Sequence, residues 1–129
     1  MSSRPLKIFF DGGCRPNPGT IEVAVVARGV HYLFGDLGEG TNTDAEWLAL
    51  IKALELAQQL GKPDFVLLGD ARAVIAQATG RAKCRGAAVQ AHAARFAVLA
   101  QFGPPPRLRW IARTQNLAGI ALAARHPRG

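Results

Sequence analysis

Hydrophobic residues near the start of the chain fall into three short runs that turn residues separate. The runs are rich in β-branched and aromatic side chains, and Gly and Pro stand between them, which is typical of strands joined by turns. The connections are too short for a crossover, so neighbouring runs must pair antiparallel. The sequence therefore predicts three antiparallel strands, at Leu6–Asp11, Ile21–Ala27 and Val30–Phe34.

The rest of the chain alternates between helical spacing and two further apolar runs. From Asp44 to Leu60 apolar side chains recur every three or four residues, and Gly61 and Pro63 then mark a stop. Phe65–Leu68 is continuously apolar, which is typical of a strand buried on both faces and parallel to its neighbour. The remaining predicted elements are helices at Ala71–Thr79, Ala87–Phe102 and Asn116–Arg125, a basic loop at Gly80–Gly86 and a strand at Arg107–Ala112.

This order of elements, β-β-β-α-β-α-α-β-α, predicts one α/β domain over residues 1–129. Its mixed five-stranded sheet would have three antiparallel strands followed by two parallel ones, with helices on its faces.

Composition narrows the class of protein. Hydrophobic residues make up 49% and charged residues 19%, which predicts a folded core rather than disorder. No apolar run approaches the roughly 18 residues of a membrane span, and the N-terminus lacks a secretory pattern, so we expect a cytoplasmic protein without a membrane partner. We take a monomer as the default state. Cys14 and Cys84 lie far apart without metal-type spacing, which predicts free thiols.

Charge is divided unevenly along the chain. All nine Asp and Glu residues lie within residues 1–70, beside six Lys and Arg, whereas residues 71–129 carry ten Lys and Arg and no acid. This division suggests a polyanion held by one surface and a cation or proton-transfer site built from another. A basic face that is only solvated explains the same counts, so both interpretations stay open.

Three acids stand where the predicted elements bring carboxylates together. Asp11 ends the first strand, Asp70 follows the fourth, and Glu46 lies in the first turn of the long helix. If those two strands are parallel neighbours, both aspartates emerge at one sheet edge. Clustered carboxylates repel one another unless a cation lies among them, and Mg²⁺ is the usual one. Two such ions, about 3.5–4 Å apart, can activate water and stabilise the leaving oxygen of a phosphodiester.

Each of these acids also has a purely structural explanation. Glu46 completes the pattern Thr43-Asp44-Ala45-Glu46, which is typical of a capping box. Asp70 precedes a predicted helix and is equally typical of an N-cap. Asp11 stands before Gly12-Gly13, where an ordinary turn residue is common. Taken singly, Glu46 and Asp70 are better explained as caps.

Taken together with their surroundings, these residues resemble the type 1 ribonuclease H domains. The family has a strand ending in Asp-Gly, then a small residue and Asn-Pro-Gly, and Asp11–Gly19 has this form here. Its second block, Thr-Asn followed by Ala-Glu at a helix start, is seen in Thr41–Glu46. A strand running into Asp is seen in Leu67–Asp70, and the closing block in Trp110–Asn116. The resemblance covers essentially the whole chain.

The resemblance implies a metal-dependent endonuclease that cuts the RNA strand of RNA·DNA hybrids, leaving a 3′-hydroxyl and a 5′-phosphate. It implies that Asp11 bridges two Mg²⁺ or Mn²⁺ ions and that Glu46 and Asp70 hold the second. It also implies contacts with the hybrid, through 2′-hydroxyls in the minor groove, a DNA phosphate at Thr41, and phosphates along the basic loop. The residues implied in these contacts are Gly12, Cys14, Asn17, Thr41, Asn42, Arg81, Lys83 and Arg85. Turn chemistry alone also explains Asn17, and a solvated loop also explains the last three residues.

One departure from the family concerns a fourth carboxylate. In the family, an Asp lies four residues after the Asn that opens the last helix, whereas here Ile120 follows Asn116 at that spacing. That Asp holds the metal that activates the attacking water, so its loss should slow the chemical step. Asn116 lies on the same helix face and is a possible weak substitute ligand through its carbonyl oxygen.

Smaller departures concern histidines. The His-bearing loop of longer members is replaced by Arg113–Gln115, and we interpret His31 and His92 as structural or surface residues. Two functions therefore stay open: a ribonuclease H, slow or preferring Mn²⁺, and a catalytically degenerate module that binds nucleic acid or another protein. Integrases and transposases share three acids on such a sheet but lack the Asp-Gly…Asn-Pro-Gly turn.

Overall fold

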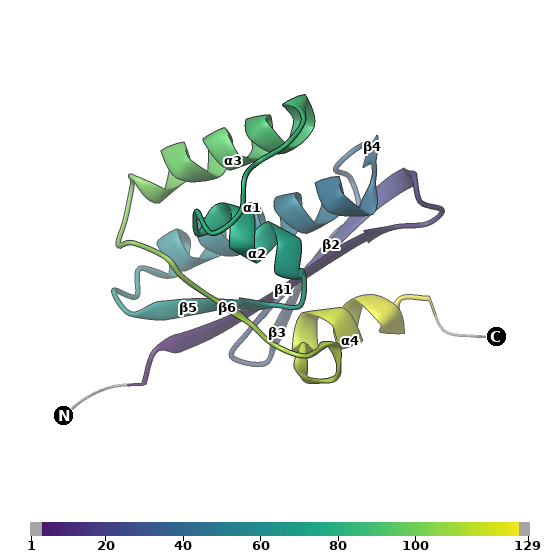
Figure 1. The fold of residues 1–129 in the computed structure, drawn as a ribbon. Helices are drawn as coiled ribbons and strands as arrows, with labels where there is room; N and C mark the ends of the chain where they lie inside the picture. Colours follow the sequence, from purple (N-terminus) through teal and green to yellow (C-terminus); the bar gives the residue numbers. More distant parts are fainter. Residues whose placement is uncertain (1–3, 127–129) are drawn as a thin grey trace.

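In the computed structural model, one mixed sheet lies between helices on both of its faces (Figure 1). The structure describes residues 4–126; residues 1–3, part of the N-terminal stretch considered above, and residues 127–129 lie outside the described part. The strands are β1 (Leu6–Cys14), β2 (Gly19–Ala27), β3 (Val30–Phe34), β4 (Glu39–Gly40), β5 (Phe65–Gly69) and β6 (Arg107–Trp110). The helices are α1 (Asn42–Leu60), α2 (Arg72–Ala78), α3 (Ala87–Ala100), the short 3₁₀ helix η1 (Arg113–Gln115) and α4 (Leu117–Ala124).

The main sheet has the order β3-β2-β1-β5-β6, with β4 as an extra partner of β2. The pairs β1–β2 and β2–β3 are antiparallel, whereas β1–β5 and β5–β6 are parallel, which confirms the predicted fold class. The two-residue strand β4 was not predicted, because so short a segment shows no hydrophobic period. It pairs Gly40 with Gly19 and thereby brings the start of α1 close to the start of β2.

The side chains on the two faces of β1 pack into two separate hydrophobic cores. Ile8 and Phe10 point into the larger core, which α1, α2 and α3 complete. Phe9 points to the other face, where it packs with Ala24 and Val26 of β2 against α4. Since side chains alternate along a strand, Asp11 shares the face of Phe9, so it lies on the side of the sheet that α4 covers.

Element ends differ from the predicted ones for identifiable reasons. β1 continues to Cys14 because its pairing with β2 extends to Ile21. α1 begins at Asn42, since Thr41 is the N-cap. The last strand ends at Trp110, because η1 turns the chain toward Asn116, which caps α4. Among the described residues, no helix is both long and apolar enough to cross a membrane.

Candidate active site

Asp11 and Asp70 emerge side by side at one edge of the sheet. β1 and β5 are parallel, and Phe9 pairs with Leu68. Asp11 follows Phe9 by two residues, and Asp70 follows Leu68 by two residues. The register that aligns the two strands therefore also aligns the two carboxylates. The structure thus brings the two aspartates together as the sequence predicts, although Asp11 lies within β1 rather than at its end.

Gly12 allows Glu46 to join the two aspartates. A Cβ on Gly12 would lie 2.2 Å from the carbonyl oxygen of Ala45, a separation that no real side chain tolerates. Only glycine at this position lets the first turn of α1 rest directly on the backbone of β1. This close approach places Glu46, the residue after Ala45, beside the end of the strand that carries Asp11.

The capping explanations do not hold for the two other acids. The capping box of α1 joins Thr41 to Asp44, not Thr43 to Glu46, so the Glu46 carboxylate is not the capping group. The N-cap of α2 is Ala71, and no side chain caps that helix, so Asp70 does not cap it either.

Two contacts fix the turn that carries Asp70. The indole N–H of Trp110 on β6 donates to the Asp70 carbonyl oxygen at 3.2 Å, and the guanidinium carbon of Arg72 lies 3.7 Å from the centre of the Trp110 ring. Asn116 fixes the carboxylate itself, since its amide nitrogen donates to Asp70 Oδ2 at 3.0 Å. The same nitrogen donates to the Phe10 carbonyl oxygen at 3.0 Å.

The geometry of Asn116 corrects its expected role as a substitute metal ligand. Its amide oxygen accepts the backbone N–H of Ala118 at 3.1 Å, as an N-cap does, and its amide nitrogen faces Asp70. An NH₂ group carries no lone pair for a metal. Asn116, which is fully buried, is therefore placed to orient Asp70.

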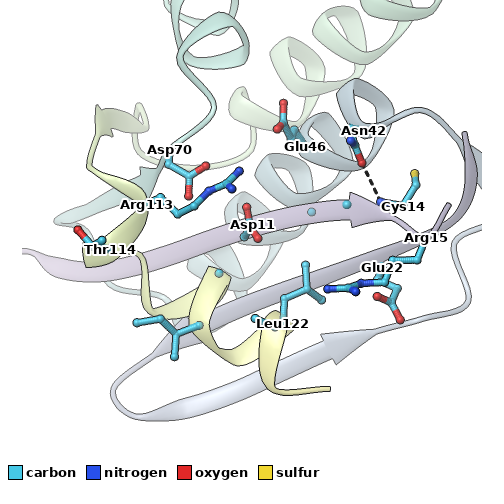
Figure 2. A pocket seen from close by; sticks show the side chains of 15 residues that line it. Asp11, Cys14, Arg15, Glu22, Asn42, Glu46, Asp70, Arg113, Thr114 and Leu122 are labelled. Carbon is cyan, nitrogen blue, oxygen red and sulfur yellow. Dashed lines mark hydrogen bonds between the residues drawn. The ribbon is translucent and has the colours of Figure 1, made fainter. Parts of the chain in front are cut away.

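The three carboxylates line one cleft of about 630 Å³ (Figure 2). Three residues predicted to contact the hybrid, Gly12, Cys14 and Asn42, line the same cleft. Asn17 and Thr41 do not line it, and neither do Arg81, Lys83 and Arg85, which are exposed in the loop between α2 and α3. The structure thus divides the predicted contacts between the cleft and more distant surface.

Asparagine side chains hold the rim of this cleft together. The backbone N–H of Cys14 donates to Asn42 Oδ1 at 2.9 Å, and the backbone N–H of Asn42 donates to Asn17 Oδ1 at 3.0 Å. The carbonyl oxygens of both side chains thus tie the end of β1, the following turn and the start of α1 together. Within the described residues their NH₂ groups have no hydrogen-bond partner, so both are donors beside the cleft.

Burial and mutual repulsion make the carboxylates harder to ionise. Burial, followed by the charges of Asp70 and Glu46, raises the pKa of Asp11 from 3.8 to about 7. Burial and the charge of Asp70 raise the pKa of Glu46. The positive charge of Arg113 acts in the opposite direction on both groups, lowering each pKa. The cleft is a place where a cation would relieve strong repulsion.

The carboxylate groups that line the cleft are of the chemical type that binds Mg²⁺. The carboxylates of Asp11, Glu46 and Asp70 line this cleft, and Mg²⁺ binds through one or two carboxylates while retaining waters and substrate phosphates. Within residues 4–126 no three Asp, Glu, His or Cys side chains come together closely enough to form a metal cage. The arrangement thus suits an ion that shares its coordination with the substrate and water.

Ile120 lies at the cleft but offers no ligand. It lines the cleft from α4 and is 56% exposed. A Cβ added to its neighbour Gly119 would lie 3.5 Å from Asp11 Oδ2, so this turn of α4 lies close to the Asp11 carboxylate. A carboxylate carried by this turn of α4 would therefore reach the same cleft.

Sequence reasoning did not assign Arg113, Arg15 or Glu22 to the site, although all three line the cleft. In Figure 2 the guanidinium of Arg113 extends beside Asp70 toward the centre of the cleft. Its only sequence signal is its position in the loop that replaces the His-bearing loop. No sequence signal marks Glu22. It pairs with Gly13 of β1, and because Gly13 is two residues after Asp11, the Glu22 side chain points to the same face of the sheet as Asp11.

Comparisons with known proteins agree with this fold. The reverse transcriptase-like family matches residues 9–126. A ribonuclease HI of Halobacterium salinarum is 43% identical over 77 residues, 56% of this chain and 39% of that protein. A ribonuclease H of a Cyanothece species is 36% identical over 78 residues, 57% of this chain and 50% of that protein. The matched segments thus span half or less of these curated relatives.

Solved structures match over nearly the whole chain. The RNase H1 structure of Halobacterium salinarum has a TM-score of 0.81 and 31% identity, covering 92% of this chain and 94% of that one. LC11-RNase H1 in complex with an RNA/DNA hybrid has a TM-score of 0.82 and 26% identity, covering 91% and 92%. Together with the family match, this likeness shows that the chain belongs to the reverse transcriptase-like family of RNase H-like domains.

Proposed function

We propose that this domain is a ribonuclease H that cuts the RNA strand of RNA·DNA hybrids with the help of Mg²⁺ or Mn²⁺. The observation that carries the proposal is the convergence of Asp11, Glu46 and Asp70 in one cleft of an RNase H-like fold. The raised pKa values of Asp11 and Glu46 are typical of sites that bind a cation or transfer protons.

In this proposal the carboxylates of Asp11, Glu46 and Asp70 would hold the metal, which would supply an activated water and stabilisation of the leaving oxygen. Asn116 keeps the Asp70 carboxylate turned toward the cleft through the hydrogen bond at 3.0 Å. Gly12 and Cys14 present backbone, and Asn17 and Asn42 present amide groups, to the 2′-hydroxyls of the RNA strand.

Arg113 has two roles in the proposed reaction. Before substrate binds, its charge keeps Asp11 and Glu46 more ionised than burial alone would allow. When the hybrid binds, the guanidinium can donate to a non-bridging phosphate oxygen, where charge-assisted hydrogen bonds are strong. Arg81, Lys83 and Arg85, all exposed, contribute contacts to phosphates that weaken as salt rises.

A relative supports the choice of substrate. The matched structure of LC11-RNase H1 is a complex with an RNA/DNA hybrid, and it aligns over 91% of this chain. A cytoplasmic location and a monomeric state stay predictions from the sequence.

One observation favours a second candidate, a degenerate module that binds hybrid without cutting it. The α4 position expected to carry a carboxylate holds Ile120, and it is exposed in the cleft rather than packed in the core. Such a module would retain the rim contacts and the basic loop.

Cleavage of an end-labelled RNA·DNA hybrid with Mg²⁺ or Mn²⁺ separates the two candidates. The nuclease proposal expects cleavage by the natural protein, none by Asp11→Asn, and faster cleavage by Ile120→Asp. Leu117→Asp is the matched control, because Leu117 is on the same helix and 45% exposed but does not line the cleft. No cleavage until Ile120 becomes Asp, while the natural protein still binds the hybrid, would establish the binding module instead.

A further inference from the structure

We propose that His92 is a positioning residue for the nucleic acid: its charge, acting through Asp44, sets how strongly the start of α1 holds a DNA phosphate. This inference rests on the proposed function, since it takes an RNA·DNA hybrid as the ligand. It assigns a role to a histidine that sequence analysis interprets as structural or a surface residue.

His92 is held in a fixed position between two helices. It lies on α3, which runs along α1 on the same side of the sheet (Figure 1). Its Nε2 is 2.9 Å from Asp44 Oδ1, and its ring stacks on Trp47 with the planes 12° apart. Trp47 is fully buried, so the imidazole rests on a rigid surface.

The other oxygen of Asp44 is bound to Thr41. Asp44 Oδ2 accepts the backbone N–H of Thr41 at 2.9 Å and its hydroxyl at 3.1 Å. The backbone N–H of Asp44 donates back to Thr41 Oγ1 at 3.2 Å. A continuous chain of hydrogen bonds therefore leads from His92 on α3 through Asp44 to Thr41 at the start of α1.

This chain controls the charge that an incoming phosphate meets. A helix N-terminus attracts anions, but the Asp44 carboxylate, held against Thr41, repels them. Protonated His92 neutralises that carboxylate, whereas neutral His92 leaves its charge in place. The side chains of His92 and Asp44 are only 18% and 23% exposed, so solvent weakens this pairing less than it would on an open surface.

No other charged group in the described part of the chain pairs with His92. The elements around it carry further charges, on α1, α2 and α3 and on the loop before α3. These are Glu46, Lys52, Glu55, Arg72, Arg81, Lys83, Arg85 and Arg95. Arginine and lysine keep their charge between pH 5.5 and 8, and any contribution of Glu46, whose pKa is raised, is present with and without His92→Gln, so that variant isolates the part of the pH dependence due to His92.

The test measures binding of a labelled RNA·DNA hybrid by Asp11→Asn protein without metal, at fixed salt, from pH 5.5 to 8. Binding should weaken with rising pH, and adding His92→Gln should remove about threefold to tenfold of that weakening. His31→Gln is the matched control, because His31 is exposed on the edge strand β3, whereas His92 lies on the helix α3. His92→Lys, which keeps a positive charge at every pH used, should bind tightly and with little pH dependence.

Different results would overturn the inference and the proposed function. Equal pH dependence of binding with and without His92→Gln would refute the role of His92, while hybrid cleavage by the natural protein could still stand. Absence of both cleavage and hybrid binding at every pH would refute the proposed function itself.

Discussion

Replacement of Asn116 by alanine tests how far one buried side chain holds the candidate site together. Asn116 makes three hydrogen bonds, to Phe10, Asp70 and Ala118, and it is fully buried. Losing the N-cap of α4 destabilises by about 1 kcal/mol. Leaving the buried Phe10 carbonyl unpaired adds about 1–3 kcal/mol. Water can replace the partly buried bond to Asp70, so we expect a total of about 2–4 kcal/mol.

The assay is urea unfolding at pH 7, followed by circular dichroism. Asn116→Ala should lower the midpoint without changing the slope, since the surface exposed on unfolding stays nearly the same. The matched control is Gln115→Ala, a change in the preceding, exposed residue, which should shift the free energy of unfolding by no more than about 0.5 kcal/mol.

Asn116→Asp shows which of the three bonds matters. Aspartate is as good an N-cap as asparagine, so it keeps the bond from the Ala118 N–H. It also puts an oxygen against the Phe10 carbonyl and the Asp70 carboxylate, where a donor is required. We therefore expect Asn116→Asp to be at least as destabilised as Asn116→Ala at pH 7. Near-natural stability of the aspartate variant would refute the reasoning, because it would show that capping alone accounts for Asn116.

Three further predictions follow from the same cleft. Gly12→Ala should destabilise the protein by about 1–3 kcal/mol and reduce hybrid cleavage, because the new Cβ would lie 2.2 Å from the Ala45 carbonyl oxygen. Gly13→Ala is the control and should do neither, because its Cβ would come no nearer than 3.8 Å to Asn42. Equal unfolding midpoints of the two variants would contradict this prediction. Since the pKa of Asp11 is raised from 3.8 to about 7, the folded protein keeps a proton that the unfolded chain releases, so the free energy of unfolding should fall between about pH 4 and pH 7. Asp11→Asn should flatten that fall and be more stable than the natural protein at pH 7.5, by roughly 2–4 kcal/mol, and a steeper fall in urea titrations across this range would count against the assignment. Arg113→Gln should raise the pKa of both Asp11 and Glu46, as carboxyl carbon NMR would show, and should slow cleavage; unchanged titration curves would mean that Arg113 does not act on these groups.

The antiparallel and parallel pairing of the strands could be predicted because buried strands are recognisable in the sequence as apolar runs. Phe65–Leu68 is apolar throughout, since both faces of β5 are covered, and the short turns near the start of the chain allow only antiparallel pairing. The ends of α1 were harder to predict because two capping patterns overlap, Thr41 with Asp44 and Thr43 with Glu46. The pairing of β4 with β2 at Gly40 leads the chain into α1 at Thr41, and this contact cannot be seen in the local sequence.

The candidate site could be predicted only where a motif carries it. Asp11, Glu46 and Asp70 follow from their places at strand and helix ends. Glu22 enters the cleft through the register between β1 and β2, which depends on the irregular turn between these strands. The direction in which the Asn116 amide points depends on two partners that are distant in sequence, so its role as an orienting residue needed the structure.

The hydrogen bond between Asn116 and Phe10 spans 106 residues of sequence, and the one between His126 and Glu22 spans 104. Ribosomes deliver a chain from its N-terminus, so β1 and α1 leave the ribosome long before α4 does. During that interval the nascent chain carries Asp11 and Glu46 but lacks both the helix that covers Asp11 and the amide that orients Asp70. The cleft is therefore completed only after α4 has been translated, long after Asp11 and Glu46 have left the ribosome.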